Sequence, residues 1–279
     1  MRPITTPSYV TTHYHDKNYF LEHIDEIRNG IRGLVKGDQI DVSVVIPAYN
    51  EEEKILRTLA SLSKTQTALS VEILIVNNNS SDKTKELAEL AGATVITETK
   101  QGVQNARTAG LHAAKGKLII NADADTIYTP YWVELMTSPL KNENISMAYG
   151  KFAFFPESGA PRLLYFLYET SSDPYKWWLA KTKEEAMFVY GCTSCYRKEQ
   201  AIAVNGFEHP PGTNEDGYLG YKLRTKFGKL YKVTSNKALA WTSDRRLIEG
   251  GGVFASFTKR FRKALTQKID TSNLEKSQS

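Results

Sequence analysis

The chain has 279 residues, of which 41% are hydrophobic and 24% charged, and its formal net charge at pH 7 is +5. This composition is typical of one globular α/β domain, and no apolar stretch approaches the roughly 18 residues of a membrane-spanning helix. The N-terminus lacks the apolar core of a signal peptide, and the modest charge gives no reason to expect a nucleic-acid partner. Cys192 and Cys195 are too few for a disulfide framework and suit a reducing compartment. We therefore expect a soluble, cytoplasmic protein.

From residue 42 onwards the sequence alternates between strand and helix patterns. Continuous apolar runs predict buried strands at residues 42–46 and 71–76, and a third strand is expected at residues 93–97. Apolar residues at helical spacing predict a helix after each of these strands, at residues 51–63, 82–91 and 101–115. Further helices are expected at residues 18–35 and 217–227. This alternation predicts a mostly parallel sheet, whose ligands bind beyond the carboxyl ends of the strands.

A fourth strand, starting at Lys117, ends in two carboxylates, Asp123 and Asp125. Side chains two residues apart on an extended segment point the same way, so both can face one cleft. Two carboxylates that close repel each other unless a cation lies beside them. The pattern favours a divalent-metal site, and a solvated acidic turn is the alternative.

Three consecutive amides, Asn77, Asn78 and Asn79, follow the second strand. They offer both donors and acceptors, as recognition of a base or ribose requires. The chain has no Gly-x-Gly-x-x-Gly after its first strand and no Gly-x-x-x-x-Gly-Lys-Ser/Thr sequence. Dinucleotide-dependent dehydrogenases and P-loop enzymes are therefore poor fits.

A series of segments, in this order and at this spacing, resembles a known family. Those of the first half are Val42–Glu51, Ile73–Thr84, Gly102–Gly110 and Asp123–Asp125, and those of the second are Gly191–Lys198, Val204–Phe207 and Asn214–Arg224. They resemble the nucleotide-binding and acceptor halves of family 2 inverting glycosyltransferases. The resemblance implies a single GT-A domain at residues 41–247, an α/β, Rossmann-like fold with a mixed, mostly parallel sheet flanked by helices. Residues 1–40 would form an N-terminal helical extension and residues 248–279 a basic C-terminal segment, partly disordered.

The same resemblance implies a role for each site residue. The residues that would line the nucleotide are Pro47, Ala48, Tyr49, Glu51, Asn78, Arg107 and Ala122. Asn78 stands where the family more often carries Asp. Asp123 would hold the ribose or the metal, and Asp125 would ligate Mg²⁺ or Mn²⁺ on the diphosphate. Such a cation stabilises the charge that develops on a departing nucleoside diphosphate.

Asp216 is the general base that the resemblance implies, in a single displacement with inversion at the sugar carbon. It stands at the start of the helix at 217–227, where an acid is also favoured by the helix dipole. The chain has no histidine near Trp241, where many members carry a metal ligand. Arg245 and Arg246 could clamp the diphosphate instead, and ordinary surface arginines are the alternative.

Two segments bear on the acceptor and on membrane contact. Residues 161–180, which include Trp177 and Trp178, are rich in aromatics that could stack on sugar rings, contact a membrane interface or form core. Phe254–Leu265 mixes Phe with Lys and Arg at helical spacing, which suits either peripheral contact with anionic lipid at the inner face of the membrane or an ordinary packed helix. The Cys192-x-x-Cys195 pair is interpreted as core, because a second pair for zinc is missing.

The sequence thus predicts a metal-dependent inverting glycosyltransferase that moves a sugar from a nucleotide-diphosphate sugar, with UDP favoured over GDP. The acceptor is a saccharide, a lipid-linked saccharide, a protein or a small molecule, and the sequence does not choose among them. An Asp-x-Asp phosphohydrolase is one alternative, but that class needs Thr or Val at the position of Ile127 and carries its motif on the first strand. A sugar-phosphate nucleotidyltransferase is another, but the loop after strand one lacks the glycines and basic charge of that class. A nucleotide-sugar-binding protein that has lost turnover is the third.

Overall fold

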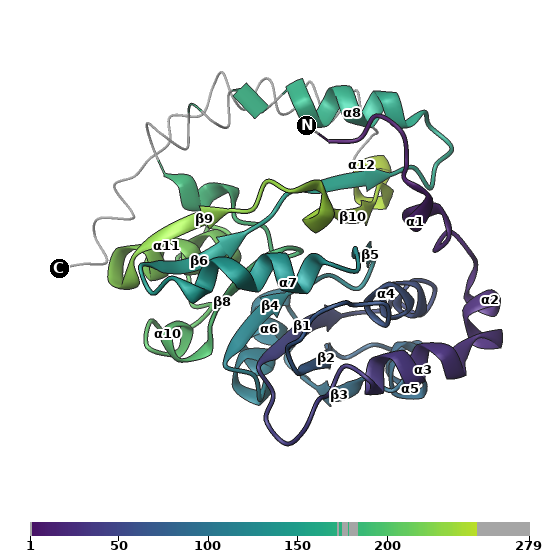
Figure 1. The fold of residues 1–279 in the computed structure, drawn as a ribbon, viewed down its shortest axis with the longest axis horizontal. Helices are drawn as coiled ribbons and strands as arrows, with labels where there is room; N and C mark the ends of the chain where they lie inside the picture. Colours follow the sequence, from purple (N-terminus) through teal and green to yellow (C-terminus); the bar gives the residue numbers. More distant parts are fainter. Residues whose placement is uncertain (1, 172, 175–177, 179–183, 250–279) are drawn as a thin grey trace.

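The computed structural model describes residues 2–171, 173–174, 178 and 184–249. Its centre is a sheet with the strand order β3-β2-β1-β4-β8-β6-β9 (Figure 1). These strands are β1 Val42–Ala48, β2 Val71–Asn77, β3 Thr94–Thr97, β4 Leu118–Asn121, β6 Ile145–Tyr149, β8 Ser194–Arg197 and β9 Lys229–Lys232. β1 pairs in parallel with β2 and β4, β2 with β3, and β6 with β9, whereas β8 is antiparallel to β4 and β6. The mixed, mainly parallel sheet that the sequence predicts is confirmed.

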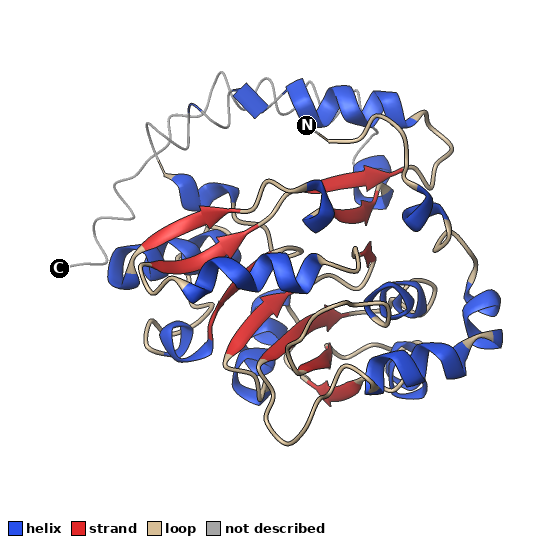
Figure 2. Ribbon diagram, in the orientation of Figure 1, coloured by secondary structure: helices blue, strands red, loops and turns tan. Residues whose placement is uncertain are grey.

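Helices cover both faces of this sheet (Figure 2). They are α1 Ser8–Thr11, α2 Lys17–Glu22, α3 Ile24–Arg32, α4 Ile55–Leu62, α5 Thr84–Leu90, α6 Val103–Ala113, α7 Trp132–Thr137, α8 Arg162–Ser171, α10 Lys198–Ile202, α11 Glu215–Phe227 and α12 Arg245–Glu249. Alternate residues of a strand face opposite sides. Accordingly Val44 packs in one core cluster with Leu59 of α4, while Val45 packs in another with Leu111 of α6. Both faces of β1 are therefore buried.

A second, smaller sheet joins segments that are far apart in the chain. Its order is β5-β10-β7, with β5 Thr126–Ile127, β7 Phe152–Phe155 and β10 Ala240–Ser243. The N-terminal residues lie along it (Figure 1). Arg2 Nε donates to the Phe152 carbonyl at 2.8 Å, Trp241 Nε1 donates to the Tyr9 hydroxyl at 2.9 Å, and the Tyr14 hydroxyl donates to the Pro156 carbonyl at 2.7 Å. The N-terminal residues therefore fasten the smaller sheet and the loop that follows β7.

Three element boundaries differ from the sequence prediction. The expected helix at 18–35 is two helices, because His23 leaves helical geometry between α2 and α3. The helix expected from residue 51 begins at Ile55, since the amides of residues 51 and 52 donate to the side chains of Thr84 and Asp82 at the start of α5. β1 continues through Pro47 to Ala48. Its pairing with β4 ends at Val45, so the missing Pro47 N–H removes no hydrogen bond to β4.

The aromatic segment at 161–180 divides between core and surface. Tyr165 and Tyr168 of α8 are buried, whereas Leu163 and Leu167 on the same helix are exposed, and Trp178 is 50% exposed. Trp177 and the stretch Phe254–Leu265 lie outside the described residues. Within the described part of the chain, no helix has the length and apolar character needed to cross a membrane.

Candidate active site

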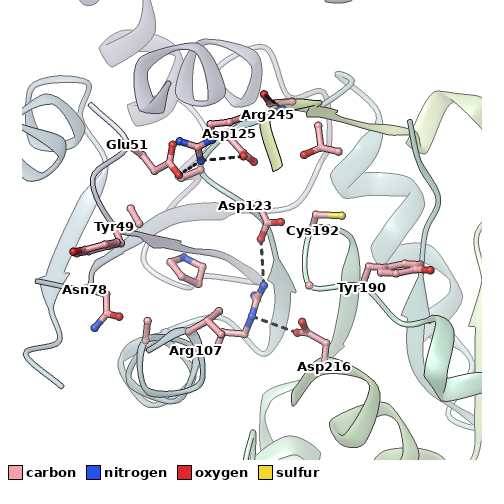
Figure 3. A pocket seen from close by; sticks show the side chains of 18 of the residues that line it. Tyr49, Glu51, Asn78, Arg107, Asp123, Asp125, Tyr190, Cys192, Asp216 and Arg245 are labelled. Carbon is pink, nitrogen blue, oxygen red and sulfur yellow. Dashed lines mark hydrogen bonds and ion pairs between the residues drawn. The ribbon is translucent and has the colours of Figure 1, made fainter. Parts of the chain in front are cut away.

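A cavity of about 1120 Å³ opens at the carboxyl ends of β1, β2 and β4, where the fold predicts the ligand site. Figure 3 shows Tyr49, Glu51 and Asn78 on one side, Tyr190 and Asp216 on the other, and Asp123 between them. Of the predicted site residues, those that line it are Pro47, Ala48, Tyr49, Glu51, Asn78, Arg107, Asp123, Asp125, Asp216 and Arg245. Residues of the predicted nucleotide-binding half and of the predicted acceptor half thus line the same cavity.

Two predicted residues do not join this set. Ala122 is fully buried and packs in the core, and Ala124 lines the cavity in its place. The side chain of Arg246 lies outside the described part of the structure, so only Arg245 of the arginine pair can be placed.

Asn78 uses its amide to hold the next loop. Its Nδ2 donates to the carbonyls of Glu98 and Lys100 at 3.0 and 2.9 Å, and its Oδ1 accepts from the Gly102 amide at 2.8 Å. A carboxylate has no N–H to offer those two carbonyls. The loop geometry therefore accounts for Asn at a position where Asp is the more usual residue of the family that the sequence resembles.

Asp123 and Asp125 lie in the turn after β4 rather than on an extended strand, and both still reach the cavity. Asp123 Oδ1 accepts from Arg107 Nη2 at 3.2 Å, and Asp125 Oδ2 lies 3.6 Å from Arg245 Nη2. The same Arg245 nitrogen donates to Glu51 Oε1 at 2.6 Å. Each aspartate of the pair is therefore neutralised by a different arginine.

Among the described residues, no three His, Cys, Asp or Glu side chains form a group that could hold a metal by itself. Mg²⁺-type cations are commonly bound by one or two carboxylates together with substrate phosphates and water. Asp123 and Asp125 supply such oxygens. Glu51 Oε2 is buried without a hydrogen-bond partner in the described structure. This donor set fits a cation that is shared with a bound diphosphate.

Asp216 is buried in the first turn of α11, whose N-cap is Asn214. Its Oδ1 lies 3.4 Å from Arg107 Nε and accepts from Asn121 Nδ2 at 3.3 Å. Burial raises the pKa of Asp216 to about 6, an effect that the positive charge of Arg107 opposes. The Tyr196 hydroxyl in turn donates to Asn121 Oδ1 at 3.1 Å. The carboxylate is thus fixed through one oxygen by two side chains.

Arg107 connects the two sides of the site, because it contacts both Asp123 and Asp216 (Figure 3). Its Nη1 is buried without a hydrogen-bond partner among the described residues. A Cβ atom at Gly191 would lie 1.9 Å from Arg107 Nη2 and 2.4 Å from Asp216 Oδ2. Glycine at position 191 therefore leaves the room that this ion pair occupies.

Sequence reasoning missed several residues of the site. Asn121 gave a usable signal, since it is an amide between Ile120 and Ala122 on a strand that is otherwise apolar. In the opposite cavity wall, the aromatic run at 161–180 marked Tyr168 of α8, but nothing in the sequence indicated that Phe152 and Phe154 of β7 would lie beside it. Cys192 lines the cavity and Cys195 is core, and both are free and buried.

Residues 43–202, more than half of the chain, match the family described as Glycosyl transferase family 2. The chain belongs to glycosyl transferase family 2. It is 32% identical over 126 residues to Glycosyltransferase AglE of Haloferax volcanii, which covers 42% of this chain and 41% of the relative. It is 31% identical over 119 residues to UDP-Glc:alpha-D-GlcNAc-diphosphoundecaprenol beta-1,3-glucosyltransferase WfgD of Escherichia coli, covering 41% and 47%. The matches thus span less than half the length of these curated relatives.

Solved structures of glycosyltransferases share the fold. Glucosyl-3-phosphoglycerate synthase from Mycobacterium tuberculosis, solved with Mn²⁺, UDP-glucose and phosphoglyceric acid, has a TM-score of 0.54 at 20% identity and covers 85% of this chain and 83% of its own. Mannosyltransferase PcManGT from Pyrobaculum calidifontis, solved with GDP-Man and Mn²⁺, has a TM-score of 0.57 at 15% identity and covers 91% and 74%. The GT-A fold that the sequence predicts for this family member is confirmed.

Proposed function

We propose that this family 2 member is a metal-dependent, inverting glycosyltransferase that moves a sugar from a nucleoside-diphosphate sugar to an acceptor hydroxyl. The observation that carries the proposal is the placement of Asp216 across one cavity from Asp123 and Asp125. The acid pair serves the leaving group on one side, and a single buried carboxylate serves the incoming hydroxyl on the other. UDP is favoured as the nucleotide, because the names of WfgD and of the Mycobacterium structure both include a UDP-sugar.

The charge of the cavity supports the need for a cation. Its lining carries the carboxylates of Glu51, Asp123, Asp125, Glu215, Asp216 and Glu249 against the guanidinium groups of Arg107 and Arg245. A diphosphate would be repelled from such a surface unless its charge were offset. A Mg²⁺ or Mn²⁺ held by Asp125 and Asp123 would stabilise the negative charge of the leaving diphosphate. Arg245 and the unpartnered Nη1 of Arg107 add donors for an anionic group.

Asp216 suits the role of general base. A base works best when its pKa lies near the working pH, and burial raises the pKa of Asp216 to about 6. Arg107 and Asn121 bind Oδ1, so the other oxygen takes the proton of the acceptor hydroxyl. The hydroxyl oxygen then bonds to the anomeric carbon as the bond to the diphosphate breaks and its electron pair leaves with the nucleotide. One displacement of this kind inverts the configuration at that carbon.

Further features of the proposal concern the acceptor and the location. A saccharide or lipid-linked glycan is the proposed acceptor, as the name of WfgD describes for that relative. We also propose a catalytic domain at residues 41–247 between an N-terminal extension and a basic C-terminal segment. The protein would act in the cytoplasm with peripheral contact to the membrane.

Thermal unfolding with UDP, GDP, CDP and dTDP, each with and without Mn²⁺, tests the donor site. A ligand at 100 times its Kd adds about 2.7 kcal/mol, which raises Tm by roughly 5–10 °C for a domain of this size. We expect a Mn²⁺-dependent shift with UDP that Asp125→Ala abolishes. Glu143→Ala, an exposed acid outside the cavity, is the matched control and should keep the shift. If none of the nucleotides shifts Tm, the donor-site assignment is wrong.

A further inference from the structure

The side of the cavity opposite the nucleotide residues is aromatic. It is formed by Phe152 and Phe154 of β7, Tyr168 of α8 and Tyr190, which precedes β8. Phe152 meets Tyr190 edge to face with ring centroids 5.0 Å apart, and Phe154 in the same manner at 5.5 Å. Phe152 and Tyr190 are partly exposed, whereas Phe154 and Tyr168 are buried behind them. These four residues are called the aromatic wall below.

The β7 strand of the aromatic wall is held in place by groups outside the cavity. β7 pairs with β10 along its whole length, from Phe152 to Phe155. The carbonyl of Phe152 accepts from Arg2, and the amide of Phe154 donates to the buried Glu169 carboxylate at 2.7 Å. Arg162 in turn donates to the same carboxylate at 2.7 Å. The backbone that carries Phe152 and Phe154 is therefore preorganised, which lowers the entropy cost of binding a ligand against them.

The aromatic wall lies next to the candidate base. Gly191 directly follows Tyr190, and a Cβ atom on Gly191 would lie only 2.4 Å from Asp216 Oδ2. The free oxygen of Asp216 thus faces the backbone that carries the Tyr190 ring. Tyr190 and Asp216 both line the cavity, so a ring bound against Tyr190 would occupy the same space as the candidate base.

The electrostatics of the cavity select against an anionic ligand on this wall. Among the described lining residues the only cations are Arg107 and Arg245, and both are paired with carboxylates. A metal-bound nucleotide sugar would add roughly balanced charge, so the surplus of carboxylates would remain. A phosphorylated acid would meet like charge there. A pyranose ring carries no charge, and its C–H face suits an aromatic surface.

We propose that the aromatic wall is an acceptor subsite for an uncharged pyranose ring, which Tyr190 and Phe152 contact and whose hydroxyl Asp216 deprotonates. This inference rests on the proposed function and adds to it the chemical class of the acceptor. It excludes a phosphorylated carboxylic acid from this position. The reaction that produces the acceptor must accordingly leave an uncharged sugar at the position that receives the transferred sugar.

Binding to the protein loaded with UDP and Mn²⁺ tests the proposal. The probes are the methyl glycosides of glucose, galactose, mannose, N-acetylglucosamine and N-acetylgalactosamine, with 3-phosphoglycerate as the anionic comparison, followed by ligand-observed saturation transfer and calorimetry. We expect at least one glycoside to bind more tightly than 3-phosphoglycerate. Tyr190→Ala and Phe152→Ala should each weaken that glycoside about tenfold, the loss expected from removing one ring contact.

Two control variants separate stacking from a general loss of structure. Tyr190→Phe retains the ring and should bind the glycoside nearly as well as the wild type. Tyr231→Ala removes an exposed ring of β9 outside the cavity and should change nothing. UDP and Mn²⁺ affinity is measured first on every variant and should stay at the wild-type value.

The outcomes distinguish this proposal from the one on which it rests. If UDP binds but no glycoside does, or 3-phosphoglycerate binds more tightly, the acceptor class is wrong while the donor site stands. If the glycoside binds equally to Tyr190→Ala and Phe152→Ala, the location is wrong. If UDP itself fails to bind the wild type, both proposals fall, because the subsite presupposes the donor site.

Discussion

Gly191→Ala is the substitution that best tests the arrangement around Asp216. The added methyl group would lie 1.9 Å from Arg107 Nη2 and 2.4 Å from Asp216 Oδ2, far inside van der Waals contact. Both side chains are buried, so neither can swing into solvent at little cost. The methyl group must therefore push the guanidinium and the carboxylate apart or displace the chain between Tyr190 and Cys192.

The expected cost of this change has two parts. Inserting a methyl group into a packed site destabilises a protein by about 1–3 kcal/mol, which lowers Tm by roughly 2–12 °C here. A well-placed general base contributes about 10²–10⁴-fold to the rate, so we expect kcat to fall at least a hundredfold. Gly150→Ala is the matched control, because its Cβ would also clash, at 2.3 Å from Thr193 Oγ1, without lining the cavity.

The assay follows release of UDP from the donor in the presence of Mn²⁺ and the best-binding methyl glycoside, alongside thermal unfolding of each variant. Gly150→Ala should lose stability but keep kcat at a temperature where it is folded, whereas Gly191→Ala should lose kcat even when folded. The reasoning is refuted if the folded Gly191→Ala protein turns over at the wild-type rate. It is equally refuted if both variants lose activity in proportion to their loss of stability.

Three further outcomes are expected from the same contacts. Burial raises the pKa of Asp216 to about 6, so kcat/KM should rise with pH up to about 6 and then level off. UDP affinity measured at pH 5 and 7.5 should stay the same. A kcat/KM profile that is flat between pH 5 and 7.5 would exclude Asp216 as the base. Asn78→Asp replaces two amide donors by an oxygen that faces two carbonyls. Tm should therefore fall by an amount corresponding to about 1–3 kcal/mol of stability. An unchanged Tm would contradict the loop contacts of Asn78. Asn121→Leu removes a hydrogen bond to Asp216 and leaves the Tyr196 hydroxyl without its acceptor. We therefore expect kcat to fall about tenfold, the effect of roughly 1.4 kcal/mol, while UDP affinity is unchanged. A rise in Kd for UDP with kcat intact would place Asn121 in donor binding instead.

The first half of the fold follows from the sequence because its signals are local. Buried parallel strands appear as continuous apolar runs, and each is followed by a helix with its own periodicity. The smaller sheet could not be predicted, since β5, β7 and β10 are two to four residues long and meet only after the chain has folded. The break at His23 also escaped prediction, because neither Gly nor Pro marks it.

The candidate site divides in the same way. Asp123, Asp125 and Asp216, which all line the cavity, could be predicted because they stand in recognisable motifs at strand and helix ends. The partners of Arg107 could not be foreseen, since the two acids that it contacts come from the turn after β4 and from α11. Charge pairing of this kind is fixed by tertiary packing, and sequence spacing carries no record of it.

The position of the N-terminal residues has a consequence for how such enzymes diverge. Arg2, Tyr9 and Tyr14 all contact the smaller sheet or the loop that follows it, and β7 of that sheet supplies half of the aromatic wall. Substitutions among the first fourteen residues can therefore reshape the space opposite the nucleotide without altering a single residue of β1, β2 or β4. Acceptor specificity could therefore evolve through substitutions near the N-terminus while the donor-binding residues stay the same.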